Sequence, residues 1–152
     1  MSIWKFLHVI SMFAAVSLFV GVSVLFERLL ATRDVPAIRR FESVSVPVVR
    51  VAIVVVLLGL VFGLITVGDE NFSYTATWVV IAYFLFAGLF ALGPLEGRSQ
   101  TKIYAAAKSS PDDAPSPELE AQITSTGRRV LVMTSMVLYV AIIYDMVMKP
   151  FS

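Results

Sequence analysis

The only histidine of the sequence, His8, is followed four residues later by Met12. Residues four apart lie on the same face of a helix, so the imidazole and the thioether would point in the same direction. Both groups are ligands of haem iron and of copper. The pair therefore predicts a cofactor site, with His8 as an axial haem ligand or as a copper ligand shared with Met12, Met146 or Met148. The alternative interpretation is a neutral histidine that makes one interhelical hydrogen bond.

A second group of polar side chains is expected near the same end of the molecule. Asp145 lies at a depth similar to that of His8, and Lys149 follows it by four residues. An acid four residues before a base forms a favourable helix pair. The other interpretation pairs Asp145 with His8 across the bundle, where a carboxylate would fix the imidazole tautomer. His8, Asp145 and Lys149 would then form a polar outer mouth with three further charged residues, Lys5, Asp69 and Glu70.

Other kinds of catalytic group are missing from the sequence pattern. The chain has no cysteine, which excludes disulfides, thiolate metal sites and iron–sulfur clusters. The serines and threonines of the apolar runs have no histidine at a spacing that would activate them, and no phosphate loop or zinc spacing occurs. A net charge of +1 creates no field that would attract nucleic acid. These observations favour a protein that is not an enzyme.

The elements that position these residues are predicted from composition. Hydrophobic residues make up 58% of the 152 residues and charged residues only 15%, whereas soluble domains contain about 25% charged residues. A spanning helix needs about 20 consecutive apolar residues, and in lipid a helix satisfies its own backbone groups while an isolated strand does not. We therefore expect a single membrane domain over residues 1–152, an all-α, antiparallel four-helix transmembrane bundle with spans at about 4–26, 48–67, 76–95 and 130–148.

The basic residues predict the orientation of the spans. Ten of the twelve lysines and arginines fall in or beside the first and third connections, residues 27–47 and 96–129. Only Lys5 and Lys149 lie at the opposite side. Because positive connections stay in the cytoplasm, we expect both termini to be non-cytoplasmic, an N-out, C-out topology.

The third connection has internal structure of its own. Residues 109–117 contain three prolines and several serines and aspartates, a composition typical of a flexible linker. Ser116 is a suitable cap for a new helix with Pro117 in its first position. We expect this helix to continue through Gly127 into the fourth span.

Small residues mark the predicted packing surfaces. Gly59 and Gly63 form a GxxxG motif, a groove that lets another helix approach closely. The first span offers a matching ridge of small residues, Ala14, Ser17 and Gly21. By helical geometry this ridge is nearly opposite the face that carries His8 and Met12. The motif indicates packing within the bundle or contact with a second copy or another subunit.

Several short motifs along the whole chain carry a family resemblance. They are Ile3-Trp-Lys-Phe-Leu-His8 with Gly21 in the same span, Thr77-Trp78, Gly93-Pro94, and Asp145-Met-Val-Met-Lys149. In this order they resemble a family of small predicted four-helix bacterial integral membrane proteins of unknown function, which implies a multi-pass protein of the cell inner (cytoplasmic) membrane. His8 with its Trp4-Lys5 prelude is also distantly similar to haem-associated protoporphyrinogen-oxidase-like and copper-resistance-type membrane proteins. That likeness implies a haem or copper ion at His8.

Two functions follow as hypotheses. The first is a non-enzymatic membrane subunit or scaffold that is surrounded by membrane lipids and packs against itself, as a homo-oligomer, or against a larger membrane complex. The second is a haem- or copper-linked membrane redox or transport protein that uses His8.

Overall fold

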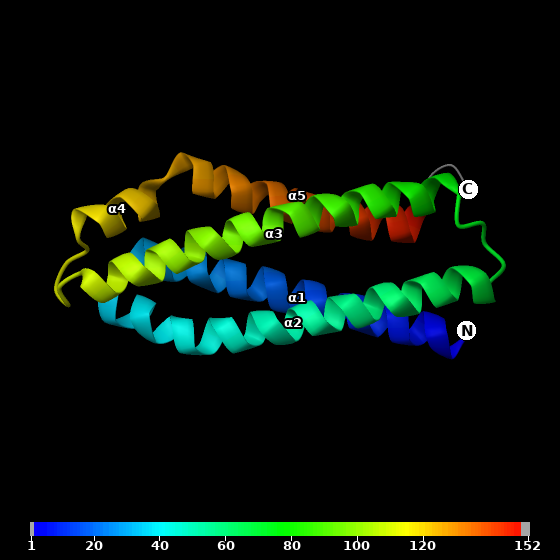
Figure 1. Ribbon diagram of the computed structural model, residues 1–152, viewed down its shortest axis with the longest axis horizontal. Helices are drawn as coiled ribbons and strands as arrows, with labels where there is room; N and C mark the ends of the chain where they lie inside the picture. Colours follow the sequence, from blue (N-terminus) through cyan, green and yellow to red (C-terminus); the bar gives the residue numbers. More distant parts are fainter. Residues whose placement is uncertain (1, 150–152) are drawn as a thin grey trace.

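The computed structural model describes residues 2–149 and consists of five helices joined by short connections (Figure 1). No strand occurs in this part of the chain. The helices are α1 (Ile3–Thr32), α2 (Val35–Asp69), α3 (Thr77–Ser109), α4 (Pro117–Thr124) and α5 (Thr126–Met148).

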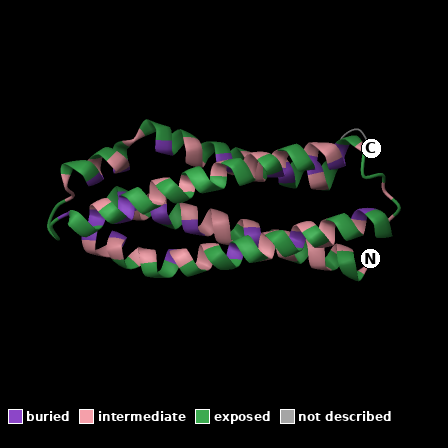
Figure 2. Cartoon of the chain, in the orientation of Figure 1, coloured by how far each residue is buried: buried purple, intermediate pink, exposed green. Residues whose placement is uncertain are grey.

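Four of the helical segments are long and apolar enough to cross a membrane, as predicted: α1, α2, α3 and the α4–α5 segment. The all-α fold and the antiparallel four-helix arrangement are therefore confirmed. Exposed residues occur along all of these segments (Figure 2), and large apolar residues are among them, including Phe13 at 73% and Phe84 at 74% exposure. Outward apolar side chains are favourable in hydrocarbon, where lipid tails take the place of water.

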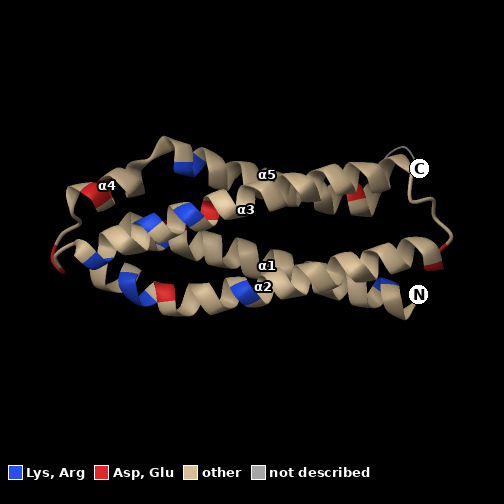
Figure 3. Ribbon diagram, in the orientation of Figure 1, with Lys and Arg blue, Asp and Glu red and all other residues tan. Residues whose placement is uncertain are grey.

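The helices pack as two antiparallel pairs, α1 with α2 and α3 with α5 (Figure 1). The first and last described residues and the α2–α3 connection lie at one end, and the α1–α2 turn and the α3–α4 connection at the other (Figure 1). We call these the terminal end and the connection end. Lysines and arginines gather toward the connection end (Figure 3), whereas Lys5 pairs with Glu70 at the terminal end.

The first connection, residues 27–47, is mostly helical. The flanking helices extend into it beyond the expected spans, because α1 continues to Thr32 and α2 begins at Val35. Only Arg33 and Asp34 form the turn, with Arg33 in the left-handed conformation (φ 57°) and the Asp34 carboxylate accepting a hydrogen bond from Ala37 N at 2.9 Å. Pro47 lies inside α2, so the helix begins 13 residues before the expected start of the second span.

Tertiary packing explains why this connection is helical. The connection end holds the largest buried apolar cluster of the described residues, which we call the connection-end core. It contains side chains from α1, α2, α3 and α4: Phe26, Leu30, Val35, Ile38, Ile103, Tyr104, Ala107, Leu119 and Ile123. With 30, 35 and 33 residues, α1, α2 and α3 are about 45–52 Å long and extend beyond a hydrocarbon layer of about 30 Å. The extensions therefore need a core of their own.

The third connection follows its predicted start but not its predicted end. Ser116 caps α4, and its hydroxyl accepts a hydrogen bond from Leu119 N at 3.2 Å. The helix then stops at Thr124, and α5 begins at Thr126. Ser125 interrupts the continuous helix that was expected through Gly127, and its hydroxyl caps α5 by accepting from Arg128 N. The break lets α4 turn Leu119 and Ile123 into the connection-end core.

Candidate functional site

His8 lies between α1 and α2 and is hydrogen-bonded to the backbone of α2. Its Nδ1 is 2.7 Å from the carbonyl oxygen of Gly59. A carbonyl oxygen only accepts hydrogen bonds, so Nδ1 carries the proton and donates it. In the neutral ring the lone pair then belongs to Nε2. This is the interhelical hydrogen bond that the simpler interpretation of His8 expects.

The glycines of α2 make room for this contact. A Cβ atom on Gly63 would lie 2.8 Å from both Cε1 and Nδ1 of His8, and one on Gly59 would overlap the methyl group of Met12. The GxxxG groove is therefore filled by the His8 and Met12 side chains of the same chain. We call this contact the histidine groove.

The small-residue ridge of α1 does not fill that groove, contrary to the match drawn from the sequence. Ser17 is exposed, and no atom lies within 4 Å of the position that a Cβ on Gly21 would take. The opposite side of the helix is the one in the core, with Ala15, Val22 and Phe26 buried. The physical reason is the helix period, because only one of two opposed faces can contact α2. We call Ala14, Ser17 and Gly21 the open face of α1.

Asp145 is buried without a polar partner. The residue is 2% exposed, and neither carboxylate oxygen has a hydrogen-bond partner within residues 2–149. The expected pair with Lys149 is not formed. Lys149 ends α5 in the left-handed conformation (φ 42°), which breaks the regular four-residue helix spacing. Its ammonium group lies instead over the rings of Phe72 and Trp78, 4.0 and 5.1 Å from their centroids.

His8 and Asp145 are not paired across the bundle either. The rings of Phe19 and Tyr139 stack at 6.1 Å and fix the level of α5 against α1. Asp145 follows Tyr139 by six residues, and because α5 runs antiparallel to α1, it lies six residues before Phe19, near the level of Phe13. That level is about 8 Å along the helix axis from His8. Of the predicted outer mouth, the structure brings together Lys5 and Glu70, with 2.9 Å between Nζ and Oε2.

A second polar cluster, at the connection end, was missed at the sequence level. Arg128 is buried and forms a two-pronged ion pair with Glu27, and its guanidinium also donates to the carbonyl oxygens of Gln122 and Ile123. Glu27 is not among the residues that the sequence patterns single out. Its position at the end of an apolar run was the available signal, but the partner is 101 residues away in sequence. The pair joins α1 to the α4–α5 break.

Glu96 lines a small cavity beside this ion pair. The cavity of about 10 Å³ is lined by residues of α1, α3 and α5, and Oε1 of Glu96 is buried without a hydrogen-bond partner in residues 2–149. A volume of this size is about that of one water molecule. No group of three or more histidine, cysteine, aspartate or glutamate side chains that could hold a metal ion occurs in residues 2–149.

These features define a class of protein, a small integral membrane protein with four span-length helices and polar contacts at both ends of the bundle. Residues 2–150 match the family described as predicted integral membrane protein (DUF2269). The chain belongs to this family, which confirms the resemblance to small four-helix membrane proteins. No curated protein and no solved structure matches the chain.

Proposed function

We propose that this protein is a non-enzymatic subunit or scaffold of the cytoplasmic membrane whose α1 helix packs against a second copy or another membrane protein. The open face of α1 carries the proposal. Small residues in membrane helices let backbones approach closely, yet this bundle uses the opposite face of α1 for its own packing. A position such as Gly21, with no atom within 4 Å of a Cβ, has space for a partner helix.

The filled histidine groove supports the same assignment. Because His8 and Met12 occupy the GxxxG motif of α2, that motif is used for packing within the bundle. The α1 ridge then remains as the small-residue surface without a partner in residues 2–149. Both termini are placed outside the cytoplasm in this proposal, because the arginine-rich connection end would stay on the inner side.

Site-specific cross-linking tests the proposal. The chain has no native cysteine, so Ser17→Cys can carry a single photoreactive label in the native membrane. We expect a cross-linked product of defined mass at Ser17, either a dimer or an adduct with one partner. Phe84→Cys, an exposed position on α3, is the matched control and should give no such product. Gly21→Leu in the Ser17→Cys background should abolish the product, because it fills the open face.

The outcome that contradicts the proposal is equally definite. A monomer in mild detergent, together with equal and diffuse labelling from Ser17→Cys and Phe84→Cys, would show that lipid alone covers the open face.

A second candidate function rests on the tautomer of His8. With Nδ1–H bound to the Gly59 carbonyl, the ring is oriented as a metal-ligating histidine usually is, with the other nitrogen carrying the lone pair. Nε2 of His8 and the thioether of Met12 are the groups that would hold a haem iron or copper ion. An optical spectrum and metal analysis of protein from its native membrane test this. A Soret band or bound copper that is lost in His8→Ala would support it, and neither signal in the wild type would overturn it.

A further inference from the structure

Two carboxyl groups of the α3–α5 pair carry all the buried side-chain oxygen and nitrogen atoms that lack a hydrogen-bond partner within residues 2–149. They are Oε1 of Glu96 on α3 and both carboxyl oxygens of Asp145 on α5. Glu96 borders a cavity with room for about one water molecule. Asp145 differs, because the whole residue is 2% exposed. An ionisable residue at such a position in a membrane helix indicates a function.

The side chain of Asp145 faces α3. Cδ1 of Leu138 lies 3.4 Å from the position that a Cβ on Gly88 of α3 would take. Asp145 follows Leu138 by seven residues, which is about two helical turns, so both side chains point toward α3. Counting seven residues back from that glycine along the antiparallel helix places Asp145 at the level of Ile81 and Ala82.

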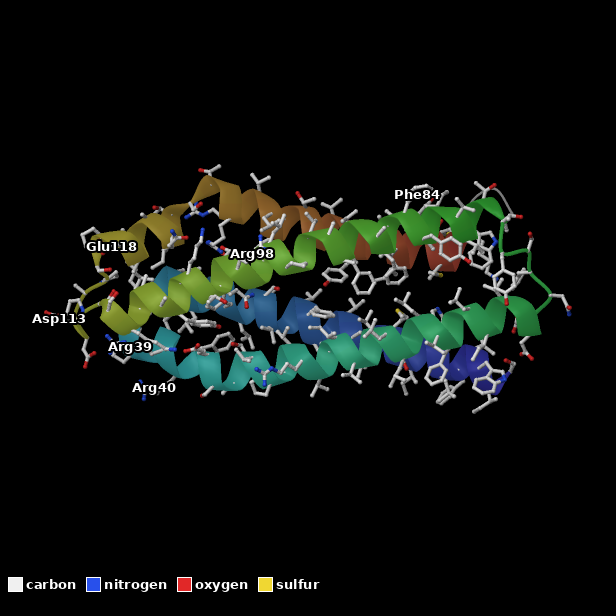
Figure 4. All side chains as sticks on the ribbon, viewed as in Figure 1. Arg39, Arg40, Phe84, Arg98, Asp113 and Glu118 are labelled. Atoms are coloured by element: carbon white, nitrogen blue, oxygen red, sulfur yellow. The ribbon has the colours of Figure 1, made fainter. Side chains whose placement is uncertain are left out.

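The part of α3 at this level is apolar. Figure 4 shows Phe84 on the outer side of α3, and its side chain is exposed. Met146, the residue after Asp145, packs against a buried apolar cluster of α2 and α3. The buried residues of α3 around the level of Asp145 are Trp78, Val79, Ala82 and Phe86.

The charged and titratable groups at this end of the bundle are engaged elsewhere or exposed. Lys5 of α1 pairs with Glu70, and His8 donates to the backbone of α2. Lys149 of α5 lies over two aromatic rings, and Tyr139 of α5 stacks on α1. The exposed groups are Asp69, Tyr74, Tyr83 and Tyr144.

A proton is the ligand that suits these surroundings. Metal cations such as Ca²⁺ need several oxygen ligands, and the buried face of α3 offers Asp145 only apolar side chains. A carboxylate without a partner is very unfavourable away from water, and such a group becomes neutral by taking up a proton. Protonation removes the charge without requiring a second polar side chain.

We propose that Asp145 is a proton-binding site, a neutral carboxylic acid packed against α3, and that loss of its proton releases the end of α5 from α3. Lys149, four residues later, is the counter-charge available to the ionised group, and it would leave the rings of Phe72 and Trp78. Because the packed state holds a proton that the released state gives up, raising the pH favours release. The site is separate from the open face of α1 and does not depend on a partner there.

Infrared spectroscopy of the full chain in lipid tests for the proton. A carboxylic acid and a carboxylate absorb at different frequencies, and ¹³C in the aspartate side-chain carboxyl groups shifts only the aspartate bands. The other four aspartates are exposed, Asp34, Asp69, Asp112 and Asp113. An ordinary aspartate is protonated in only about one molecule in a thousand at pH 7. We therefore expect the acid band of a single aspartate in the wild type at this pH.

Two variants assign that band. Asp145→Asn, which keeps the shape of the side chain, should lack the aspartic acid band. Asp113→Asn is the matched control at an exposed position of the α3–α4 connection (Figure 4), and it should keep the band. Absence of the band from the labelled wild type would overturn the proposal without any variant. A band that persists in Asp145→Asn would also overturn it.

The fluorescence of Trp78 tests the release of α5. The chain has two tryptophans, so Trp4→Phe leaves Trp78 as the only emitter. As the pH is raised into the alkaline range, we expect its emission to shift toward that of a hydrated indole. The shift should be lost when Asp145→Asn is added. Because both proteins keep Lys149 and every tyrosine, an equal response in the two would overturn the coupling between the proton and α5.

Discussion

At the scale of single residues, two glycines with the same chemistry have opposite surroundings. Gly63 faces the His8 ring, and Gly21 faces open space. A glycine inside a helix is less favourable than alanine by up to about 1 kcal/mol, so its presence needs a packing reason. That reason is evident within the chain for Gly63. For Gly21 it would have to come from a partner helix.

This contrast gives a direct stability prediction. Gly63→Ala should destabilise the protein by about 1–3 kcal/mol, because the new methyl group would lie 2.8 Å from the His8 ring and force the α1–α2 pair apart. Gly21→Ala should leave stability unchanged or slightly improved in the isolated protein. Reversible unfolding in mixed micelles measures both. If Gly63→Ala left the free energy of unfolding unchanged, His8 would not occupy the histidine groove.

Arg128 provides the second prediction at this scale. Arg128→Gln should lower the free energy of unfolding by about 1–3 kcal/mol, because it leaves Glu27 and two backbone carbonyl groups without their hydrogen-bond donor. Arg129→Gln, one residue later and exposed, should change stability by less than about 0.5 kcal/mol in lipid-free detergent. The same unfolding measurement compares them. Equal losses in the two variants would contradict the buried ion pair.

At the scale of elements, α4 is attached through its buried Leu119 and Ile123 and through one exposed ion pair. Arg33, in the α1–α2 turn, is bound to Glu120 of α4 through Nε and Nη2, with distances of 2.7–3.1 Å. This hydrogen bonding lowers the pKa of Glu120 below the usual glutamate value of 4.5. The ionised carboxylate therefore contributes to holding α4 in place.

The sign of the pH effect follows from that lowered pKa. A carboxyl group with a depressed pKa stabilises the folded state above its ordinary pKa and loses this contribution as pH falls through the lower, folded value. The backbone amides of α4 should therefore exchange hydrogen with solvent faster, relative to those of α3, as the pH falls below about 4.5. This comparison is made after each exchange rate is corrected for its intrinsic dependence on pH. Glu120→Gln should show the fast exchange already at neutral pH. Exchange in α4 that is independent of both changes would contradict this role.

At the scale of the whole molecule, charge separates the two ends of the bundle. The connection end has its own apolar core and ion pairs, while Lys5 and Lys149 lie at the terminal end. A reporter enzyme that is active only outside the cytoplasm should therefore be active when it is fused after residue 152. The same reporter should be inactive when it is inserted at residues 111–114. The opposite pattern would invert the proposed topology.

The sequence by itself determined the class and the helical spans. Long apolar runs favour helices in lipid whatever they pack against, because transfer to hydrocarbon and backbone hydrogen bonding are properties of each segment. The cap at Ser116 was predictable for the same reason, since its hydrogen bond reaches only three residues along the chain. Local chemistry was sufficient in these cases.

Only the tertiary structure decided which faces meet. The sequence offered two opposed faces of α1, and the bundle covered the one with His8 and Met12. It also made residues 27–47 helical except at Arg33 and Asp34, paired Glu27 with Arg128 and left Asp145 without Lys149. These outcomes depend on register between helices distant in sequence. A shift of one residue rotates a helix face by about 100°, and composition and spacing along one segment do not fix that rotation.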